Sequence, residues 1–201
     1  MDIRHQWRNL VDAGYYLQQS YCPELDKRYV LGRGNDEDPI AMLIGEAPGA
    51  QEAIQGKPFV GKSGVILQDL MAQAGLFTDT KLQFEPNVWL TNVVKFRPPG
   101  NRTPTEEEIR AFRRLLKTEW RLIGKPKLII PIGAVALRAV TGRWVSILRV
   151  AGKCQTVERS DGPMHVWPMV HPAYGLRNRA LQPVLEQDWK RLGAWRKVNG
   201  V

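Results

Sequence analysis

Short runs of apolar residues alternate along this chain with longer stretches in which apolar residues recur at helical spacing. The runs predict four buried strands, at residues 40–44, 87–94, 127–132 and 165–170. The stretches with helical spacing predict five helices, at residues 3–19, 63–75, 103–123, 134–141 and 180–196. Strands separated by helices imply a mostly parallel sheet with helices on both faces. We therefore predict one domain, residues 1–201, of the α/β class, with a three-layer αβα fold around a central, mostly parallel four-stranded sheet.

Turn and capping residues refine these boundaries. The longest predicted helix opens at Thr103 and Pro104, because threonine is a good N-cap and proline suits the first turn. The glutamates at 106–108 then favour the positive end of the helix dipole. Residues 21–35 are predicted to be irregular, and residues 150–162 are predicted to form a turn or hairpin with Ser160-Asp161-Gly162 at its tip.

Basic residues outnumber acidic ones, and this excess bears on the partner. The 201 residues include 29 Lys and Arg against 20 Asp and Glu, which gives a net charge of +9. Such an excess favours a polyanionic partner, above all nucleic acid. The alternative is a basic surface that serves only solubility.

Cysteine usage and hydropathy argue against a metal site, a membrane span and secretion. Cys22 and Cys154 do not form a close pair, so no metal or redox motif is complete. No apolar run approaches the length of about 18 residues that a membrane helix needs. The N-terminus lacks the apolar core of a signal peptide. We expect a cytoplasmic monomer with reduced thiols and no membrane partner.

Residues 56–63 fit the phosphate-loop pattern of Gly, four residues and Gly-Lys-Ser. A phosphate loop must run directly from a strand into a helix, so that its amides converge on the phosphates. Here about a dozen residues separate the strand end at Ile44 from Gly56. Pro58 also removes an amide that the cradle would use. The nucleotide-hydrolase interpretation is therefore a weak alternative.

Polar side chains follow three of the predicted strands. Glu46 comes after the first strand, Asn92 lies near the end of the second, and His171 follows the fourth. Phe59 lies in the loop beyond Glu46. Because parallel strands end at one edge of a sheet, we expect these side chains to share a pocket there.

Each of these residues also has an ordinary structural explanation. Glu46 could be a surface turn residue, Asn92 could satisfy backbone groups, His171 could be a packed loop histidine, and Phe59 could belong to the core. Together they suit a flat, polar ring: an aromatic face stacks on it, and an Asn amide matches the O4 and N3–H of uracil. Cytosine reverses that pattern, so the amide would discriminate against it.

Several motifs in order connect the chain with a known family. They are Gly45-Glu46-Ala47-Pro48-Gly49, Gly56-Lys57-Pro58-Phe59-Val60-Gly61-Lys62-Ser63-Gly64, Thr91-Asn92-Val93-Val94-Lys95, Arg97-Pro98-Pro99-Gly100-Asn101-Arg102 and His171-Pro172-Ala173. On these motifs, and over about residues 19–190, the chain resembles the uracil-DNA glycosylases, most closely family four, the thermostable bacterial and archaeal group.

The resemblance implies a role for each matching position. Glu46 and His171 would be catalytic: the carboxylate would orient water or stabilise a cation, and the histidine would donate to uracil O2. The implied base-binding residues are Ala47, Glu52, Phe59 and Asn92. The implied DNA-binding residues are Lys95, Arg97, Arg102, Tyr174, Leu176 and Arg177, of which the last three lie in a loop expected to enter the DNA as the nucleotide flips out.

The chain also departs from the family pattern. Family four carries an iron–sulfur cluster on four cysteines. By motif register, the four ligand positions here are Gln19, Cys22, Phe96 and Phe112, of which one is a cysteine. We therefore expect no cluster, no other cofactor and no metal. Ala53 stands where the family usually has an acid, and the Arg-Arg-Ile-His insert of relatives that bond covalently to DNA is absent.

The sequence thus predicts a DNA glycosylase for base-excision repair. It would hydrolyse the N-glycosidic bond of uracil, or of a related pyrimidine, flipped out of single- or double-stranded DNA. Two alternatives remain open at this stage. One is a non-catalytic protein on the same fold that binds uracil-containing or single-stranded DNA. The other is a glycosylase for a modified base.

Overall fold

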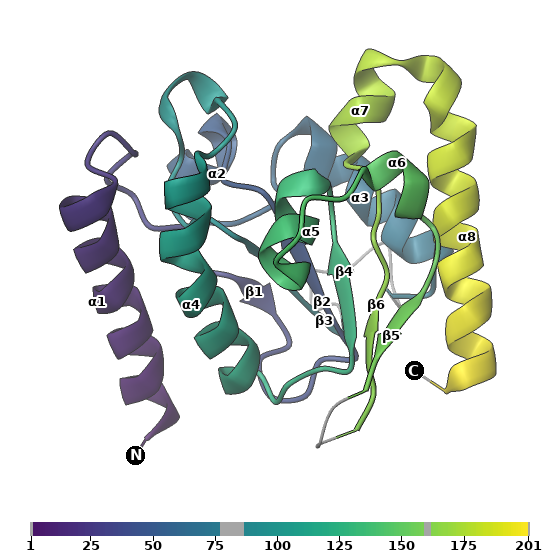
Figure 1. Cartoon of the computed structure of the whole chain (residues 1–201), viewed down its shortest axis with the longest axis horizontal. Coiled ribbons are helices and arrows are strands. Elements are labelled where there is room, and N and C mark those ends of the chain that lie inside the picture. The colour runs from purple at the N-terminus through teal and green to yellow at the C-terminus, as the bar shows by residue number, and fades with distance from the viewer. Residues whose placement is uncertain (1, 77–86, 159–161, 201) are drawn as a thin grey trace.

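A six-stranded sheet forms the centre of the protein (Figure 1). The computed structural model describes residues 2–76, 87–158 and 162–200. The strands are β1 Arg33–Gly34, β2 Ala41–Gly45, β3 Val88–Asn92, β4 Leu128–Pro131, β5 Gln155–Val157 and β6 Met164–Val166. Their order across the sheet is β1-β3-β2-β4-β6-β5. The four inner strands are parallel, and β1 and β5 pair antiparallel at the two edges.

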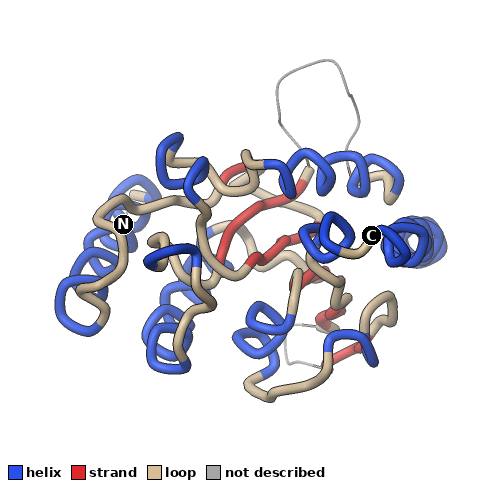
Figure 2. The backbone as a smooth tube through the Cα atoms, turned by 90° about the horizontal axis from the view of Figure 1, so that it is seen from above, coloured by secondary structure: helices blue, strands red, loops and turns tan. Residues whose placement is uncertain are grey.

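Helices cover both faces of this sheet, as the view from above shows (Figure 2). The α-helices are α1 Ile3–Tyr21, α2 Ala50–Gln55, α3 Lys62–Gln73, α4 Glu106–Leu122, α5 Ala134–Thr141, α6 Ile147–Val150, α7 Pro172–Arg177 and α8 Gln182–Asn199. Two 3₁₀ turns complete the helices, η1 Pro99–Asn101 and η2 Arg179–Leu181. In the part of the chain described, none of these helices is long and apolar enough to cross a membrane. The predicted three-layer α/β fold with a mostly parallel sheet is confirmed.

Alternating side chains of the inner strands supply the core on both faces of the sheet. On β2, Met42 and Ile44 pack with α1, α4 and α5, whereas Leu43 packs with α3 and α8. Every residue of β2 and β3 is buried. Burial on both faces explains why these strands stand out in the sequence as continuous apolar runs.

The sheet has six strands rather than the predicted four, because its edges carry little sequence signal. β1, in a region predicted to be irregular, has two residues, and all three residues of β5 are exposed. The short helices α2, α6 and α7 have six, four and six residues, too few for a periodic stripe. The hairpin predicted at 150–162 is confirmed by the pairing of β5 with β6. Two residues of its predicted tip, Ser160 and Asp161, lie outside the described residues.

The start of α4 corrects one prediction. The N-cap is Thr105 rather than Thr103. The amide of Glu108 donates to the Thr105 hydroxyl at 3.2 Å, and the Glu108 carboxylate accepts from the Thr105 amide at 2.6 Å. A capping box requires a glutamate three positions after the cap, and both threonines have one, Glu106 for Thr103 and Glu108 for Thr105, so the sequence pattern alone does not choose between them.

Hydrogen bonds beyond the strands bring their carboxyl-terminal loops together at one edge. The amide of Val93 donates to the Gly45 carbonyl at 2.9 Å, and that of Val94 donates to the Glu46 carbonyl at 3.1 Å. On the other side of β2, the amide of Gly133 donates to the Met169 carbonyl at 2.8 Å. The chain leading to His171 is thereby tied to the edge at which Glu46 and Asn92 lie.

Candidate active site

A cavity of about 220 Å³ opens at this edge of the sheet. Three segments line it, with the residues Glu46, Ala47, Pro48, Gly49, Pro98, Asn101, Arg102, His171, Ala173 and Tyr174. Glu46 and His171, the two residues predicted to be catalytic, are therefore brought to one cavity from segments far apart in the sequence. Ala47 joins them as predicted. In open α/β sheets, ligands bind at this edge.

Asn92 and Phe59 meet at Gly45, immediately before Glu46. Both side chains are almost fully buried, with exposed fractions of 4% and 6%. A Cβ placed on Gly45 would stand 2.3 Å from Asn92 Oδ1 and 2.7 Å from Phe59 Cζ. Gly45 therefore has to be a glycine if the amide and the ring are to lie this close to the strand end. The structure brings the predicted aromatic and amide groups together, but neither is among the described residues that line the cavity.

His171 is the N-cap of α7, and its role as a cap fixes its tautomer. Nδ1 accepts a hydrogen bond from the amide of Ala173 at 3.1 Å. In a neutral imidazole, one ring nitrogen accepts and the other carries the proton. Nε2 is therefore the protonated nitrogen of neutral His171. The ring can donate from Nε2 to an oxygen that gains negative charge.

Glu52 has a different position from the one expected of a pocket-lining acid. It lies on α2, and Oε1 accepts from the backbone amides of Val60 at 3.0 Å and Gly61 at 2.7 Å. The carboxylate thus braces the loop that carries Phe59. It is not among the described residues that line the cavity.

Lys95, which the resemblance assigns to DNA binding, is fully buried. Its ammonium group forms an ion pair with Glu119 of α4, and it hydrogen-bonds to the hydroxyl of Thr91 at 2.5 Å. Burial lowers the pKa of Lys95, and Glu119 opposes that shift. A side chain enclosed in the core does not reach a phosphate, so this prediction is wrong.

Glu119 is a buried partner that the sequence reasoning missed. Besides Lys95, it accepts hydrogen bonds from Trp89 Nε1 at 3.1 Å and from the Thr91 hydroxyl at 3.0 Å. A signal was present in the helical pattern. Glu119 lies four positions before Ile123 and seven after Phe112, on the apolar stripe of α4.

Arg102 lines the cavity, and Arg97 contacts Asn101, which also lines it. Arg102 makes two hydrogen bonds to Glu108, at 2.8 and 2.7 Å, and a longer ion pair with Glu24 at 3.3 Å. Burial raises the pKa of Glu108, but the hydrogen bonds from Arg102 and Thr105 outweigh burial and hold that pKa below its usual range. Arg97 Nε donates to the side chain of Asn101 at 2.7 Å.

The segment predicted to enter DNA forms α7. Tyr174 and Leu176 are exposed there, with fractions of 43% and 50%, and Tyr174 also lines the cavity. An exposed apolar residue beside the cavity suits insertion into a base stack. The side chain of Arg177 lies outside the described part of the structure.

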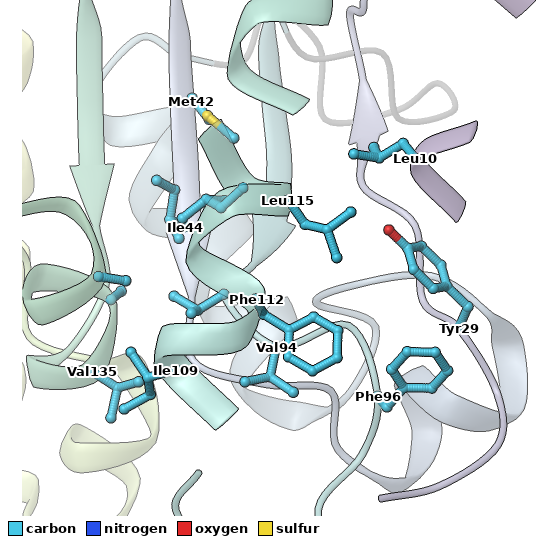
Figure 3. Packing of buried hydrophobic residues seen from close by; sticks show 14 of the residues in the cluster. Leu10, Tyr29, Met42, Ile44, Val94, Phe96, Ile109, Phe112, Leu115 and Val135 are labelled. Carbon is cyan, nitrogen blue, oxygen red and sulfur yellow. The ribbon is translucent and has the colours of Figure 1, made fainter. Parts of the chain in front are cut away.

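Two of the four positions that match the iron–sulfur ligands, Phe96 and Phe112, lie in an aromatic cluster, defined here as Tyr15, Tyr29, Phe96 and Phe112. The ring centroids of Phe96 and Phe112 are 5.9 Å apart, and those of Tyr29 and Phe96 are 5.3 Å apart. Figure 3 shows Tyr29, Phe96 and Phe112 close together, with Phe112 contributed by α4. Gln19 is exposed on α1.

Cys22 is buried in the same hydrophobic core. Burial raises the pKa of its thiol to about 11, and the carboxylates of Glu108 and Glu24 add to this effect. A cluster needs four thiolates, whereas these positions offer one protonated thiol, two phenyl rings and an exposed amide. In the described ranges, no three His, Cys, Asp or Glu side chains are grouped so as to hold a metal. The donor set therefore does not fit an iron–sulfur cluster.

The fold and the site define a class of protein. An open α/β sheet carries a cavity at its carboxyl edge. A carboxylate and a histidine line the cavity, and a ring and an amide meet at the glycine that precedes the carboxylate. The chain belongs to the uracil DNA glycosylase superfamily, whose family model matches residues 31–199.

Curated relatives agree with this family. The chain is 36% identical over 169 residues to the Type-4 uracil-DNA glycosylase of Archaeoglobus fulgidus. The aligned region covers 82% of this chain and 80% of the relative. The chain is 37% identical over 174 residues to the Type-4 uracil-DNA glycosylase of Thermotoga maritima, with 85% and 84% covered. A more distant match, 28% over 171 residues, covers 85% of this chain and 17% of a DNA polymerase from Bacillus phage SP01.

Proposed function

We propose that this protein is a uracil-DNA glycosylase, an N-glycosyl hydrolase that releases uracil from DNA. The observation that carries the proposal is the meeting of Glu46, His171, Asn92 and Phe59 at one edge of the sheet. Its similarity to the Type-4 uracil-DNA glycosylases supports the same activity. The net charge of +9 suits a DNA substrate.

The proposed reaction begins with a uracil nucleotide flipped out of the DNA at this edge of the sheet. Phe59 stacks on the base, and the Asn92 amide pairs with uracil O4 and N3–H. The bond between sugar C1′ and base N1 breaks, and both electrons leave on the base. Nε2–H of His171 donates to O2 as that oxygen gains charge. Glu46 stabilises the cationic sugar or orients the water that adds to C1′. The proton that this water loses balances the charge of the departing uracil anion, which leaves as neutral uracil.

Two further parts of the proposal concern the state of the protein. It would work without an iron–sulfur cluster, because the ligand positions are mostly apolar. The test is iron analysis and the visible absorption spectrum of protein purified without oxygen; about four iron atoms per chain would contradict it. It would act as a cytoplasmic monomer, in keeping with its two free thiols, Cys22 and Cys154.

Base release from a single-stranded oligonucleotide with one uracil, followed as alkali-labile cleavage, tests the activity. The parent protein is expected to cleave, and Asn92→Ala is expected to lose a factor of about 100 or more, since a buried hydrogen-bonding group aimed at the reacting base is removed. Asn199→Ala, at the far end of α8, is the matched control. Near-normal release by Asn92→Ala would remove the proposed role of the amide.

Two alternatives remain as outcomes of this experiment. Uracil-specific binding by the parent without release would indicate a binding protein on the same fold. Release only from a panel of C5-substituted pyrimidines would indicate a glycosylase for a modified base.

A further inference from the structure

Phe59 has a backbone conformation that its neighbours must hold. Its φ angle is 55°, in the left-handed region that bulky residues rarely adopt. Such a conformation persists only where the surrounding structure fixes it. The position of the ring beside Asn92 therefore depends on whatever grips the loop.

Three contacts hold this part of the backbone. Nη2 of Arg33 donates to the Phe59 carbonyl oxygen at 3.0 Å. The carboxylate of Glu52 accepts from the next two backbone amides, at 3.0 and 2.7 Å. Gly64 packs so closely that a Cβ there would stand 2.2 Å from the same carbonyl oxygen. The arginine is the only one of the three that comes from outside residues 50–73.

A second arginine holds the helix that carries Glu52. Nη1 of Arg28 donates to the carbonyls of Ala53 at 2.9 Å and Ile54 at 2.6 Å, at the C-terminal end of α2. Cations are favourable at that end of a helix. Two arginines of the segment before β2 thus hydrogen-bond to separate parts of this region: Arg28 binds α2, and Arg33 binds the Phe59 loop.

The segment with both arginines is itself tied to the sheet. The amide of Val30 donates to the Lys95 carbonyl at 2.8 Å. Arg33 lies in β1 opposite Leu90 of β3. Facing residues in an antiparallel pair share one face of the sheet, and Leu90 belongs to the same hydrophobic cluster as Phe59. Arg33 is therefore anchored on the face that carries the ring.

Arg33 keeps its charge at neutral pH. Burial lowers its pKa to about 10, and Glu52 opposes that shift. Its hydrogen bond to the Phe59 carbonyl is therefore charge-assisted, which makes it stronger than a bond between neutral groups.

We propose that Arg33 is a positioning residue for base binding: it holds the Phe59 carbonyl so that the ring stays beside Asn92. Arg28 supports it by holding α2, the helix that carries Glu52. The inference rests on the proposed function of the site. Neither arginine is among the described residues that line the cavity, so each acts through the loop and not on the substrate.

The test compares Arg33→Met, Arg33→Lys, Phe59→Ala and the double variant Arg33→Met/Phe59→Ala with the parent. Arg196→Met is a matched control, because its guanidinium also donates to a backbone carbonyl, that of Ala74 at 2.9 Å, and burial also lowers its pKa. Single-turnover release from the uracil oligonucleotide and affinity for a uracil-free oligonucleotide are measured for each.

Arg33→Met is expected to slow release about tenfold or more, since a misplaced ring no longer stacks on the base, while affinity for uracil-free DNA stays within about twofold. Arg33→Lys should recover part of the rate. Because both residues act through one ring, the double variant should be no more than about threefold slower than Phe59→Ala. The proposal would be overturned if the slowing of release in the double variant equalled the product of the two single-variant effects. It would also be overturned if Arg196→Met slowed release as much as Arg33→Met.

Hydrogen exchange separates this inference from the activity itself. The amides of Val60 and Gly61 should exchange about tenfold faster in Arg33→Met than in the parent, and Arg196→Met should leave them unchanged. Unchanged exchange in Arg33→Met overturns the positioning role even if the parent is active. An inactive parent with faster exchange in Arg33→Met would contradict the proposed function and leave the grip on the loop established.

Discussion

The loops that follow β2 and β3 meet at one edge of the sheet but are held in different ways. The loop after β2 carries Glu46 and Phe59, and polar side chains hold it through its own backbone, as Glu52 and Arg33 do. The loop after β3 is held by buried side chains of its own, the Lys95–Glu119 pair and the aromatic cluster.

Because of this difference, the contacts of the first loop mainly set the positions of the site residues, whereas those of the second mainly stabilise the fold. Hydrogen bonds at a partly exposed loop contribute about 0.5–1.5 kcal/mol each to the net free energy of unfolding, or about 1.5–3 kcal/mol where one partner is charged, and they fix where the ring and the carboxylate stand. Buried ions and rings are part of the core. Substitutions in the first loop should therefore be seen mainly in the rate of base release, and those in the second mainly in unfolding.

The largest effect is expected from Lys95→Met. Removing one partner of a buried ion pair leaves the other charge unpaired, which costs about 3–5 kcal/mol of unfolding free energy. Chemical denaturation measures the loss. The double variant Lys95→Met/Glu119→Gln is the control, because it neutralises both charges and should recover much of the stability. A loss below about 1 kcal/mol in the single variant would show that the pair is not buried as described.

The same pair shows how far the sequence could be read. The inner strands, the long helices and the edge shared by Glu46, Asn92 and His171 could be predicted, because burial leaves apolar runs and parallel strands end together. The burial of Lys95 could not, since it depends on a carboxylate 24 positions away on another element. Nor could the grip of Arg33 on Phe59, because β1 has only two residues and leaves no pattern.

The loop after β2 is tested by Glu52→Ala. Loss of the acceptor for two backbone amides should slow base release about tenfold, since the ring is displaced. The unfolding free energy should fall by no more than about 3 kcal/mol, because both lost bonds are to a charged group at a partly exposed site. Gln51→Ala, on an exposed neighbour in α2, is the matched control for both measurements. If Glu52→Ala lost several kcal/mol without a change in rate, the distinction between the two loops would be wrong.

A smaller loss of unfolding free energy is expected where the loop after β3 joins α4. Thr105→Ala removes half of the capping box with Glu108 and should lower the unfolding free energy by about 1 kcal/mol. Thr103→Ala is a sharp control, because that threonine is the cap predicted from the sequence. Thermal denaturation of the two variants decides between them: a larger loss in Thr103→Ala would restore the start at Thr103.

The smallest effect concerns the thiol beside the aromatic cluster. The pKa of Cys22 is raised by burial from 9.0 to about 11, so the folded protein keeps the proton over a range in which the unfolded chain loses it. The stability that this proton contributes is fully present below pH 9 and is lost as the pH rises toward 11. At pH 10 the loss should be about 1 kcal/mol.

Unfolding free energies at pH 8 and pH 10 measure this loss in the parent and in Cys22→Ala, where it should disappear. Cys154→Ala, which removes a half-buried thiol, should keep most of the pH dependence. An equal fall in the parent and in Cys22→Ala would assign the pH dependence to other groups. A fall confined to proteins with Cys22 would identify this thiol as a protonated, apolar member of the core that holds the second loop, in the position where a cluster-binding relative would need a thiolate.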